Sequence, residues 1–174
     1  MMRYLSAALA VLAFASCAAL AAAGEKIVLP EAVAKAVSEA FPDAAIDGTE
    51  VEKEAGINIY TIELKAARVE MEVAEDGTVL EITTFVDLKD VPEAAAVVIG
   101  KAARGATIKE IEKAENRAEV KKEGNIGRIV KLDNPSPVYE VELWKGDRAG
   151  EMQIAPDGRI LKPLKWHRRT GKRD

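Results

Sequence analysis

Few residues of this chain have a type and spacing that could support catalysis. Among 174 residues there is one cysteine, Cys17, and one histidine, His167. A catalytic cysteine with its histidine, a Ser-His-Asp triad and a multi-histidine zinc site all need more of these side chains in the body of the protein. The segment GNIG at 124 to 127 lacks the rest of a phosphate-binding fingerprint. We therefore predict a protein that is not an enzyme and that has no cofactor.

Two Asp-Gly pairs could be mistaken for metal sites. Asp76-Gly77 lies in AEDGTV and Asp157-Gly158 lies in APDGRI. A calcium loop needs several oxygen ligands at alternating positions, which neither segment supplies. Asp-Gly between two alternating apolar runs is instead typical of a hairpin turn. We predict that all four residues are structural turn residues and that the chain has no metal site.

Paired carboxylates are the remaining candidates for chemistry. On a strand, residues two apart share a face, so Glu70 and Glu72 lie together, as do Glu140 and Glu142. General acid-base catalysis requires burial that raises the pKa of one carboxyl, and nothing in the sequence marks a buried pocket. We predict a solvated polar face of a sheet.

The elements that must position these residues occur twice along the chain. Three blocks recur in the same order, each with its echo: VLPEAV and DVPEAA, YTIELK and YEVELW, MEVAEDGTVLEI and MQIAPDGRILKP. The first block of each set opens an apolar stripe with helical spacing, as in Val33, Val37 and Phe41. The other blocks alternate apolar and polar residues with the period of a strand.

These blocks predict an α+β fold made of two tandem α-β-β-β repeats, each a helix packed on an antiparallel sheet. The first repeat covers residues 24–86 and the second covers residues 87–163. The second copy contains an insertion at about residues 114–138, whose glycines and short apolar runs are compatible with a further hairpin.

The register of the two Asp-Gly hairpins depends on the turn type. A two-residue turn would pair Val73 with Leu80 and Met71 with Ile82. In the second copy Pro156 favours a type I turn followed by a glycine bulge, because proline fits the first turn position. We expect the bulged turn in the second copy only.

Residues 1–23 have the layout of a secretory signal peptide, with Arg3, an uncharged run and small residues before Gly24. Cleavage after Ala23 is the first interpretation. A lipoprotein is the second, because FASC ends in Cys17, the residue that bacterial lipoproteins modify. An uncleaved anchor is the third, since the uncharged run could just span a bilayer. All three place the body outside the cytoplasm, in the periplasm or secreted.

Charge divides the chain into an acidic body and a basic end. Residues 24–161 hold 18 basic and 28 acidic residues, a formal charge of −10, whereas residues 162–174 hold six basic residues and one acidic residue. We predict that residues 164–174 form a basic tail outside the fold, with His167 solvated. Trp166, Arg168 and Arg169 are candidates to bind an acidic partner or anionic lipid, with a frayed tail as the alternative.

Trp144 is the fourth candidate for partner binding. It falls on the polar parity of its strand, where the first copy has Lys65. Two interpretations are open: an exposed aromatic residue at a binding surface, or a side chain that covers the insertion.

The repeated blocks resemble PepSY-like domains, including the beta-lactamase-inhibitor-like proteins of bacterial envelopes. The likeness lies in LPEAVAKAVSEAFPDAAI, in the strands YTIEL and YEVEL, and in the AEDGTVL and APDGRIL hairpins, and it covers nearly all of residues 28–162. The resemblance implies an exported α+β module without catalytic residues that binds or restrains other envelope proteins, peptidases among them. The insertion and the basic end depart from the usual pattern.

The sequence therefore predicts a non-enzymatic, exported binding or inhibitory module that acts on an envelope or secreted protein, with a peptidase or another hydrolase as the candidate class of target. The alternative is an acidic periplasmic protein that binds a small ligand or a cation. Nucleic acid is excluded as a partner because the acidic body repels phosphate. A membrane is expected as a partner only if the chain is lipid-anchored or keeps its leader.

Overall fold

The computed structural model describes residues 27–124, 126–133, 135 and 137–169. The predicted leader with Cys17 and the last part of the predicted tail, residues 170–174, lie outside the described residues. In the described part, no helix is long and apolar enough to cross a membrane.

Two α-helices, ten strands and two short 3-10 turns make up the described part. In chain order they are α1 (Glu31–Ala40), β1 (Gly48–Glu54), β2 (Ile57–Leu64), η1 (Lys65–Ala67), β3 (Val69–Ala74), β4 (Val79–Phe85), η2 (Leu88–Asp90), α2 (Glu93–Ala102), β5 (Thr107–Asn116), β6 (Ala118–Glu123), β7 (Ile126–Lys131), β8 (Val138–Lys145), β9 (Arg148–Ile154) and β10 (Ile160–Arg168).

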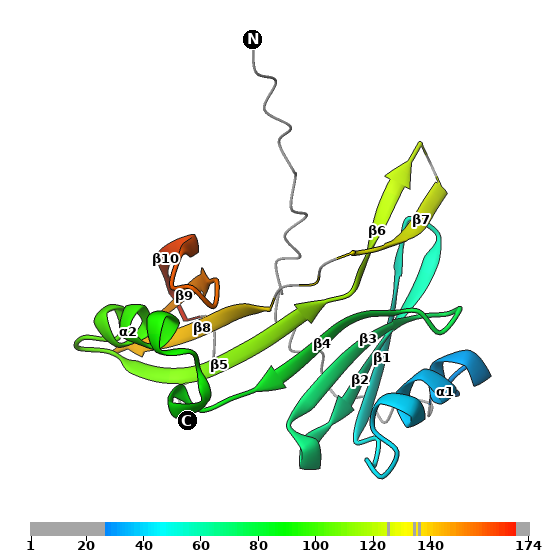
Figure 1. Cartoon of the computed structure of the whole chain (residues 1–174), viewed down its shortest axis with the longest axis horizontal. Coiled ribbons are helices and arrows are strands. Elements are labelled where there is room, and N and C mark those ends of the chain that lie inside the picture. The colour runs from blue at the N-terminus through cyan, green and yellow to red at the C-terminus, as the bar shows by residue number, and fades with distance from the viewer. Residues whose placement is uncertain (1–26, 125, 134, 136, 170–174) are drawn as a thin grey trace.

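One antiparallel sheet contains eight of these strands. Its order is β1-β2-β3-β4-β5-β8-β9-β10, and β6 pairs only with β7 in a separate hairpin (Figure 1). The pairing of β4 with β5 joins the strands that follow α1 to those that follow α2. The prediction of an α+β fold with helices on an antiparallel sheet is confirmed.

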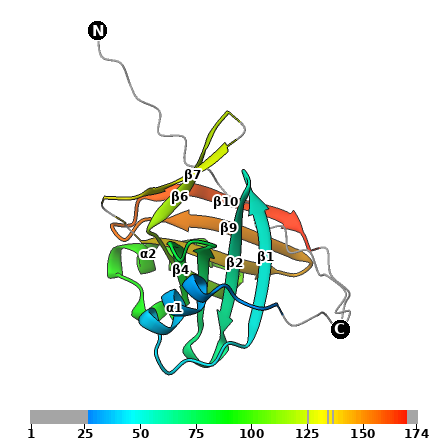
Figure 2. The ribbon, with the colours of Figure 1, turned by 90° about the vertical axis from the view of Figure 1, so that its right-hand side faces the viewer.

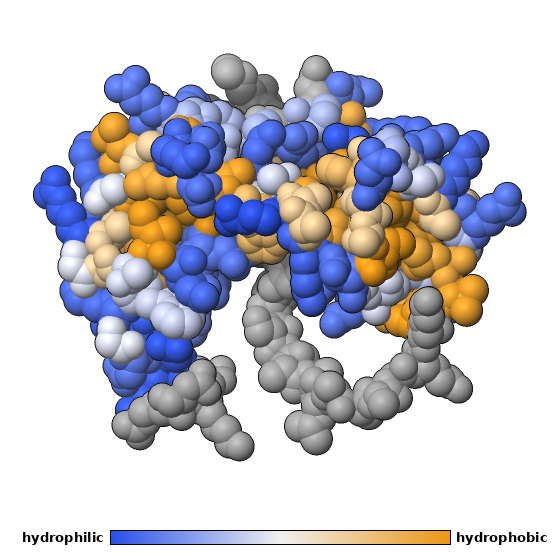
Figure 3. Space-filling model, turned by 90° about the horizontal axis from the view of Figure 1, so that it is seen from below, coloured by the Kyte–Doolittle hydropathy of each residue, from blue (hydrophilic) through white to orange (hydrophobic). Residues whose placement is uncertain are grey.

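Both helices cover the same face of the sheet, which we call the helix face. Val33 and Val37 of α1 pack on a buried cluster that includes Met71, and Ala95 and Ile99 of α2 pack on a second cluster around β8 and β9. Figure 2 shows the two helices on one side of the strands. Viewed from below in Figure 3, hydrophobic residues form one patch toward each side, with hydrophilic residues between them.

Each half contributes one strand more than we predicted. The repeats were expected as α-β-β-β, but four strands of the large sheet follow each helix, because β1 and β5 were missed. The sequence of β1, GTEVEKE, has a single apolar side chain, Val51, and that residue is 47% exposed. An edge strand with so little apolar surface leaves no alternating pattern to read.

Both Asp-Gly hairpins use the bulged turn. Ala74 N-H donates to the Thr78 carbonyl and Gly77 N-H donates to the Ala74 carbonyl, with Gly77 at φ +86°. The second hairpin has the same two bonds between Ala155, Gly158 and Arg159. The two-residue turn expected for the first copy was therefore wrong, and Val73 pairs with Val79 instead of Leu80.

The bulge changes the side of the sheet on which Leu80 lies. Leu80 is buried with Ile59 and Ala74 on the face opposite the helices, which we call the open face. Val120 of β6 and Ile129 of β7 pack against this cluster. The β6-β7 hairpin, which lies inside the predicted insertion, therefore covers one end of the open face (Figure 1).

The predicted basic tail belongs largely to the sheet. Strand β10 extends to Arg168 and pairs with β9 as far as Arg148. The prediction that residues 164–168 lie outside the fold was wrong. Leu164 and Trp166 supply apolar side chains at alternate positions, and the high charge of the segment concealed this short pattern.

Helix α1 rests directly on the first Asp-Gly turn. A Cβ added to Gly77 would lie 2.9 Å from the Ala32 carbonyl oxygen, and one added to Gly158 would lie 2.8 Å from the Ala94 carbonyl oxygen. Gly56 has a similar φ of +93° but has no atom within 4 Å of the added Cβ. Gly56 is therefore a matched control for the turn conformation alone.

We expect Gly77→Ala to destabilise the protein more than Gly56→Ala. Positive φ costs an alanine about 1 to 2 kcal/mol at either position, and the clash with α1 adds about 1 to 3 kcal/mol at Gly77 only. Urea unfolding followed by circular dichroism would measure both variants. Equal losses would contradict close packing of the helix on the turn.

Candidate functional site

The open face carries glutamates that lie directly opposite one another on neighbouring strands. Five cross-strand pairs are acid against acid: Glu63 and Glu70, Glu72 and Glu81, Glu112 and Glu140, Glu110 and Glu142, Glu142 and Glu151. Like charges opposite each other destabilise a sheet. We call Glu70, Glu72, Glu81, Glu110, Glu112 and Glu140 the glutamate array.

Burial, together with the carboxylates of Glu81 and Glu52, raises the pKa of Glu72 to about 7. Burial, together with the carboxylates of Glu110 and Glu140, likewise raises the pKa of Glu112 to about 8. Burial is also the main cause that raises the pKa of Glu70, Glu81 and Glu140. Low solvation and mutual repulsion thus act together, and both favour protonated carboxyls.

The described residues offset the negative charge of the array only weakly. Thr83 Oγ1 donates to Glu81 Oε1 at 2.9 Å, and Gln153 Nε2 donates to Glu140 Oε1 at 2.6 Å. Lys162 lowers the pKa of Glu140, but burial outweighs it. The ion pairs of the described part use other acids and include no member of the array.

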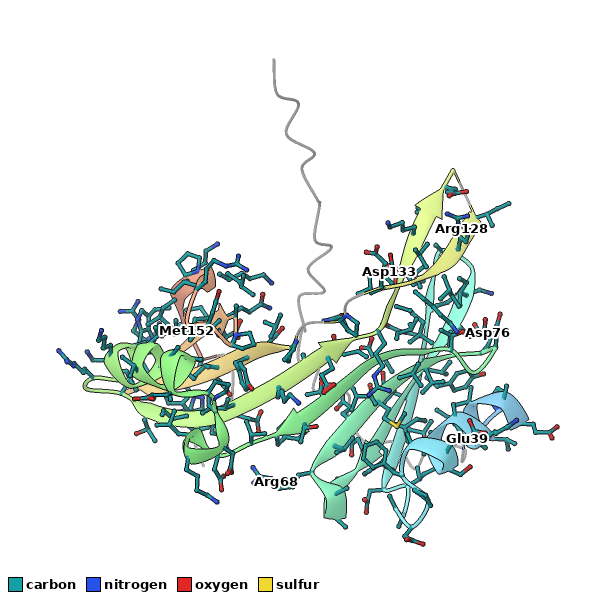
Figure 4. The ribbon with its side chains drawn as sticks, viewed as in Figure 1. Glu39, Arg68, Asp76, Arg128, Asp133 and Met152 are labelled. Atoms are coloured by element: carbon teal, nitrogen blue, oxygen red, sulfur yellow. The ribbon has the colours of Figure 1, made fainter. Side chains whose placement is uncertain are left out.

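A pocket of about 320 Å³ lies beside the array, at the η1 end of β2 and β3. Its lining residues are Glu63, Lys65, Arg68, Val69, Glu70, Phe85 and Glu110. Arg68, labelled in Figure 4, marks this end of the strands, and Asp76 marks the opposite end. The two cations of the lining are each engaged with an exposed carboxylate, Lys65 with Glu63 at 3.4 Å and Arg68 with Asp87 at 3.4 Å.

Trp144 lies on the open face at the far end of β8. Its Nε1 donates to Glu142 Oε1 at 2.7 Å, and cations from two segments approach its ring. Arg169 Cζ lies 3.6 Å from the ring centroid and Lys109 Nζ lies 5.0 Å from it. Trp144 therefore does not cover the β6-β7 hairpin, which packs near the start of β8 on residues of β2 and β4.

The other predicted partner-binding residues lie elsewhere. Trp166 is on the helix face, where it packs beside Leu164 against the α2 cluster. Gly150 gives the ring its space, because a Cβ there would lie 2.7 Å from a ring carbon. Arg168 Nε donates to Asp147 Oδ2 at 3.2 Å in an exposed pair. The structure thus brings together Trp144 and Arg169 and separates them from Trp166.

The two turn aspartates stabilise their own hairpins. Asp76 Oδ1 accepts from Thr78 N-H at 2.8 Å and Asp157 Oδ1 accepts from Arg159 N-H at 2.9 Å. Among the described residues, no group of three or more histidine, cysteine or acidic side chains is arranged to hold a metal ion. His167 lies in β10 and its Nε2 is 3.8 Å from Glu151 Oε1.

The glutamate array is the feature that sequence reasoning missed. We predicted a solvated polar face for Glu70, Glu72, Glu140 and Glu142, but all four side chains are half-buried in the structure. The array forms only when β5 joins the two halves, and β5 was not recognised. A signal was present: the spacing Glu-x-Glu occurs at 70–72, 110–112 and 140–142.

We expect the protein to lose stability as pH rises from about 5 to 8.5. The folded-state pKa values of Glu72, about 7, and Glu112, about 8, exceed the ordinary value of 4.5. Their stabilising contribution is therefore complete below about pH 4.5 and is lost as pH passes through 7 and 8. At pH 8.5 a Glu72→Gln/Glu112→Gln variant should be more stable than the wild type by on the order of 1 to 3 kcal/mol.

Urea unfolding at several pH values would measure this difference. Below about pH 4.5 the variant and the wild type should have the same free energy of unfolding. Glu39→Gln is a suitable control because Glu39 lies on the exposed side of α1, away from the open face. Parallel pH profiles for the double variant and the wild type would contradict the account.

No family model and no curated protein sequence matches the chain. Solved structures do match its fold. A protein from Bacteroides eggerthii that is described as periplasmic has a TM-score of 0.58 and 12% identity, over 80% of this chain and 90% of that one.

Two further structures agree with this match. A BLIP-like protein from Bacteroides fragilis has a TM-score of 0.56 and 12% identity, over 86% of this chain and 94% of that one. A DUF2874 family protein from Bacteroides ovatus has a TM-score of 0.56 and 10% identity, over 81% of this chain and 89% of that one. The chain therefore has a BLIP-like fold, as the resemblance predicted.

Proposed function

We propose that this protein is a non-enzymatic, exported module that binds another protein through the open face of its sheet. The observation that carries the proposal is the glutamate array. Partly buried carboxylates face one another across four adjacent strands, β3, β4, β5 and β8, and no ion pair of the described part neutralises them. Natural sequences keep such a costly arrangement where it serves binding or catalysis.

A binding role is favoured over catalysis by what surrounds the array. The raised pKa of Glu112 would suit a general acid, but among the described residues no group is arranged to hold a metal ion, and the one histidine, His167, lies on β10. The face is also broad, because it extends from the β6-β7 hairpin to Trp144. A broad polar face with an aromatic residue near its rim suits a protein partner better than a small substrate.

We further propose that the two halves are tandem copies of one PepSY-like unit. The order of elements supports this, since a helix and then four strands of the large sheet occur in each half. The contact between helix and turn supports it too, because Gly77 meets Ala32 in the first half as Gly158 meets Ala94 in the second. In this scheme the β6-β7 hairpin is an insertion specific to the second copy.

Export is supported by the signal-peptide layout of residues 1–23 and by one structural neighbour that is described as periplasmic. Cleavage after Ala23 leaves a free protein, whereas modification of Cys17 would give a lipoprotein. The intact mass of the exported protein distinguishes the two. The fold shared with a BLIP-like protein makes a hydrolase, such as a peptidase, a reasonable class of target.

The pocket beside Phe85 favours a second candidate function, the binding of a small cationic ligand. Three glutamates line this pocket of about 320 Å³, and Phe85 adds an aromatic wall. Calorimetric titration with calcium and with small organic amines would test it. Heat of binding with a saturating stoichiometry would favour this second role.

We expect a photo-crosslinker on the open face to capture a protein partner in cells that export this chain. Asn116 is suitable for replacement because it is exposed and pairs with Glu81 within the array. The matched control is a crosslinker at Lys101, which is exposed on α2 on the helix face. Specific capture from Asn116 alone, identified by mass spectrometry, is the expected result. Equal capture from both positions would reject the open face as the binding surface.

A further inference from the structure

The open face lacks positive charge at the point where negative charge is densest. The acids of the array, together with Glu63, Glu142 and Glu151, come from six strands of the sheet: β2, β3, β4, β5, β8 and β9. The cations near these acids lie at the margins of the face: Lys65 and Arg68 at the η1 end, Lys109 beside Trp144, and Lys162 and Lys165 on the edge strand β10. The centre of the face therefore has no cation of its own among the residues described.

The protein could have avoided this repulsion by a simple substitution. Glutamine has nearly the same shape as glutamate and makes no like-charge contact, and Gln153 already occupies such a position opposite Glu140. Retention of charge at Glu72, Glu81, Glu112 and Glu140 therefore costs stability without any benefit within the fold. The benefit must come from a group that is not part of the folded chain.

The pocket indicates where such a group would enter. Phe85 and Glu112 are cross-strand partners, so the Phe85 ring lies on the open face between the pocket and the array. Glu70 and Glu110 form the acidic walls, and their carboxylates take no part in the ion pairs of the described chain. The two cations of the lining, Lys65 and Arg68, are already paired with Glu63 and Asp87. An aromatic ring in a pocket with two further carboxylates is a favourable site for an ammonium or guanidinium group.

We propose that the occupant of the open face is a basic segment of the partner protein, with one lysine or arginine side chain in the pocket beside Phe85. The inference rests on the proposed function and names the chemistry of its partner. Charge complementarity is the argument for this occupant, because an acidic face with few cations of its own attracts a cationic surface and repels an acidic one.

Binding of such a segment would release protons. A cation next to Glu72 and Glu112 favours their charged forms and therefore lowers both pKa values, which are about 7 and about 8 in the free protein. The groups that face these two carboxyls are Glu52 and Glu54 of β1, Glu70 of β3, Glu81 of β4, Glu110 of β5 and Glu140 of β8. All of them are acids, so no neighbouring cation would cancel the effect.

Calorimetry with a lysine-rich peptide as the probe tests the proposal. Titrations at about pH 7.5 in phosphate and in Tris, at equal ionic strength, should give different enthalpies because released protons are taken up by the buffer. A glutamate-rich peptide should not bind. Glu70→Gln/Glu110→Gln should weaken binding of the lysine-rich peptide about five-fold or more, and Glu72→Gln/Glu112→Gln should abolish most of the proton release.

The control is Glu31→Gln/Glu39→Gln, which removes the same two charges from exposed positions on α1. If this control weakens binding as much as Glu70→Gln/Glu110→Gln, the peptide responds only to net charge and the proposal is overturned. Absence of binding, or binding without proton release, would also overturn it. Self-association of the wild type at low salt, lost in Glu70→Gln/Glu110→Gln, would identify the basic end of a second copy as the occupant instead.

These outcomes are separable from failure of the proposed function. A protein crosslinked from Asn116 through an acidic or neutral segment would reject the basic occupant and leave protein binding intact. Peptide binding as expected, without any protein captured from Asn116, would instead support an acidic site and reject the protein-binding role.

Discussion

The structure depends on the pairing of β4 with β5. Five residue pairs, from Glu81 and Asn116 to Phe85 and Glu112, join the strands of the first half to those of the second. Without this junction there would be two small helix-covered sheets, each with an exposed edge. With it, the buried clusters under α1 and α2 belong to one sheet, and glutamates from distant parts of the chain become neighbours.

The same junction places the apolar cores on one face of the sheet and the acids of the proposed binding surface on the other. Alternation along each strand places Met71, Ile82 and Val141 in the cores on the helix face. The residues between them necessarily point to the open face, and many of these are acids. The apolar clusters therefore stabilise the sheet that holds the glutamates at unfavourable distances. A surface of this kind would be preorganised for the proposed partner, because its charges are already fixed and partly desolvated.

The sequence was informative where patterns are local and apolar. Alternation in YTIEL and YEVEL, and the helical stripes of Val33 with Val37 and of Ala95 with Ile99, predicted the two cores, because burial requires such patterns. It was uninformative for β1, whose side chains are mostly charged. Turn type in the first hairpin was also missed, since Glu75 gives no signal comparable to Pro156.

The candidate site was hidden for a further reason. Glu70 and Glu112 are separated by many residues, and only the strand order brings them close. Each Glu-x-Glu pair alone has the composition of an ordinary solvated strand. The glutamates become half-buried and repel one another only because several adjacent strands place them side by side. This arrangement can be seen only when the strand order and register are known. The division of Trp144 and Trp166 between the two faces has a related origin, because it depends on the extension of β10 to Arg168, which was predicted as tail.

The two edges of the sheet differ in sign. Strand β1 presents Glu50, Glu52 and Glu54 at one edge, and β10 presents Lys162, Lys165 and Arg168 at the other. With six strands between them, these two edges give the molecule an electric dipole in the plane of the sheet. A charged surface that approaches would rotate this dipole before contact, so the first encounter with the proposed partner would be oriented. The strand order thus sets the direction of the dipole as well as the position of the proposed binding surface.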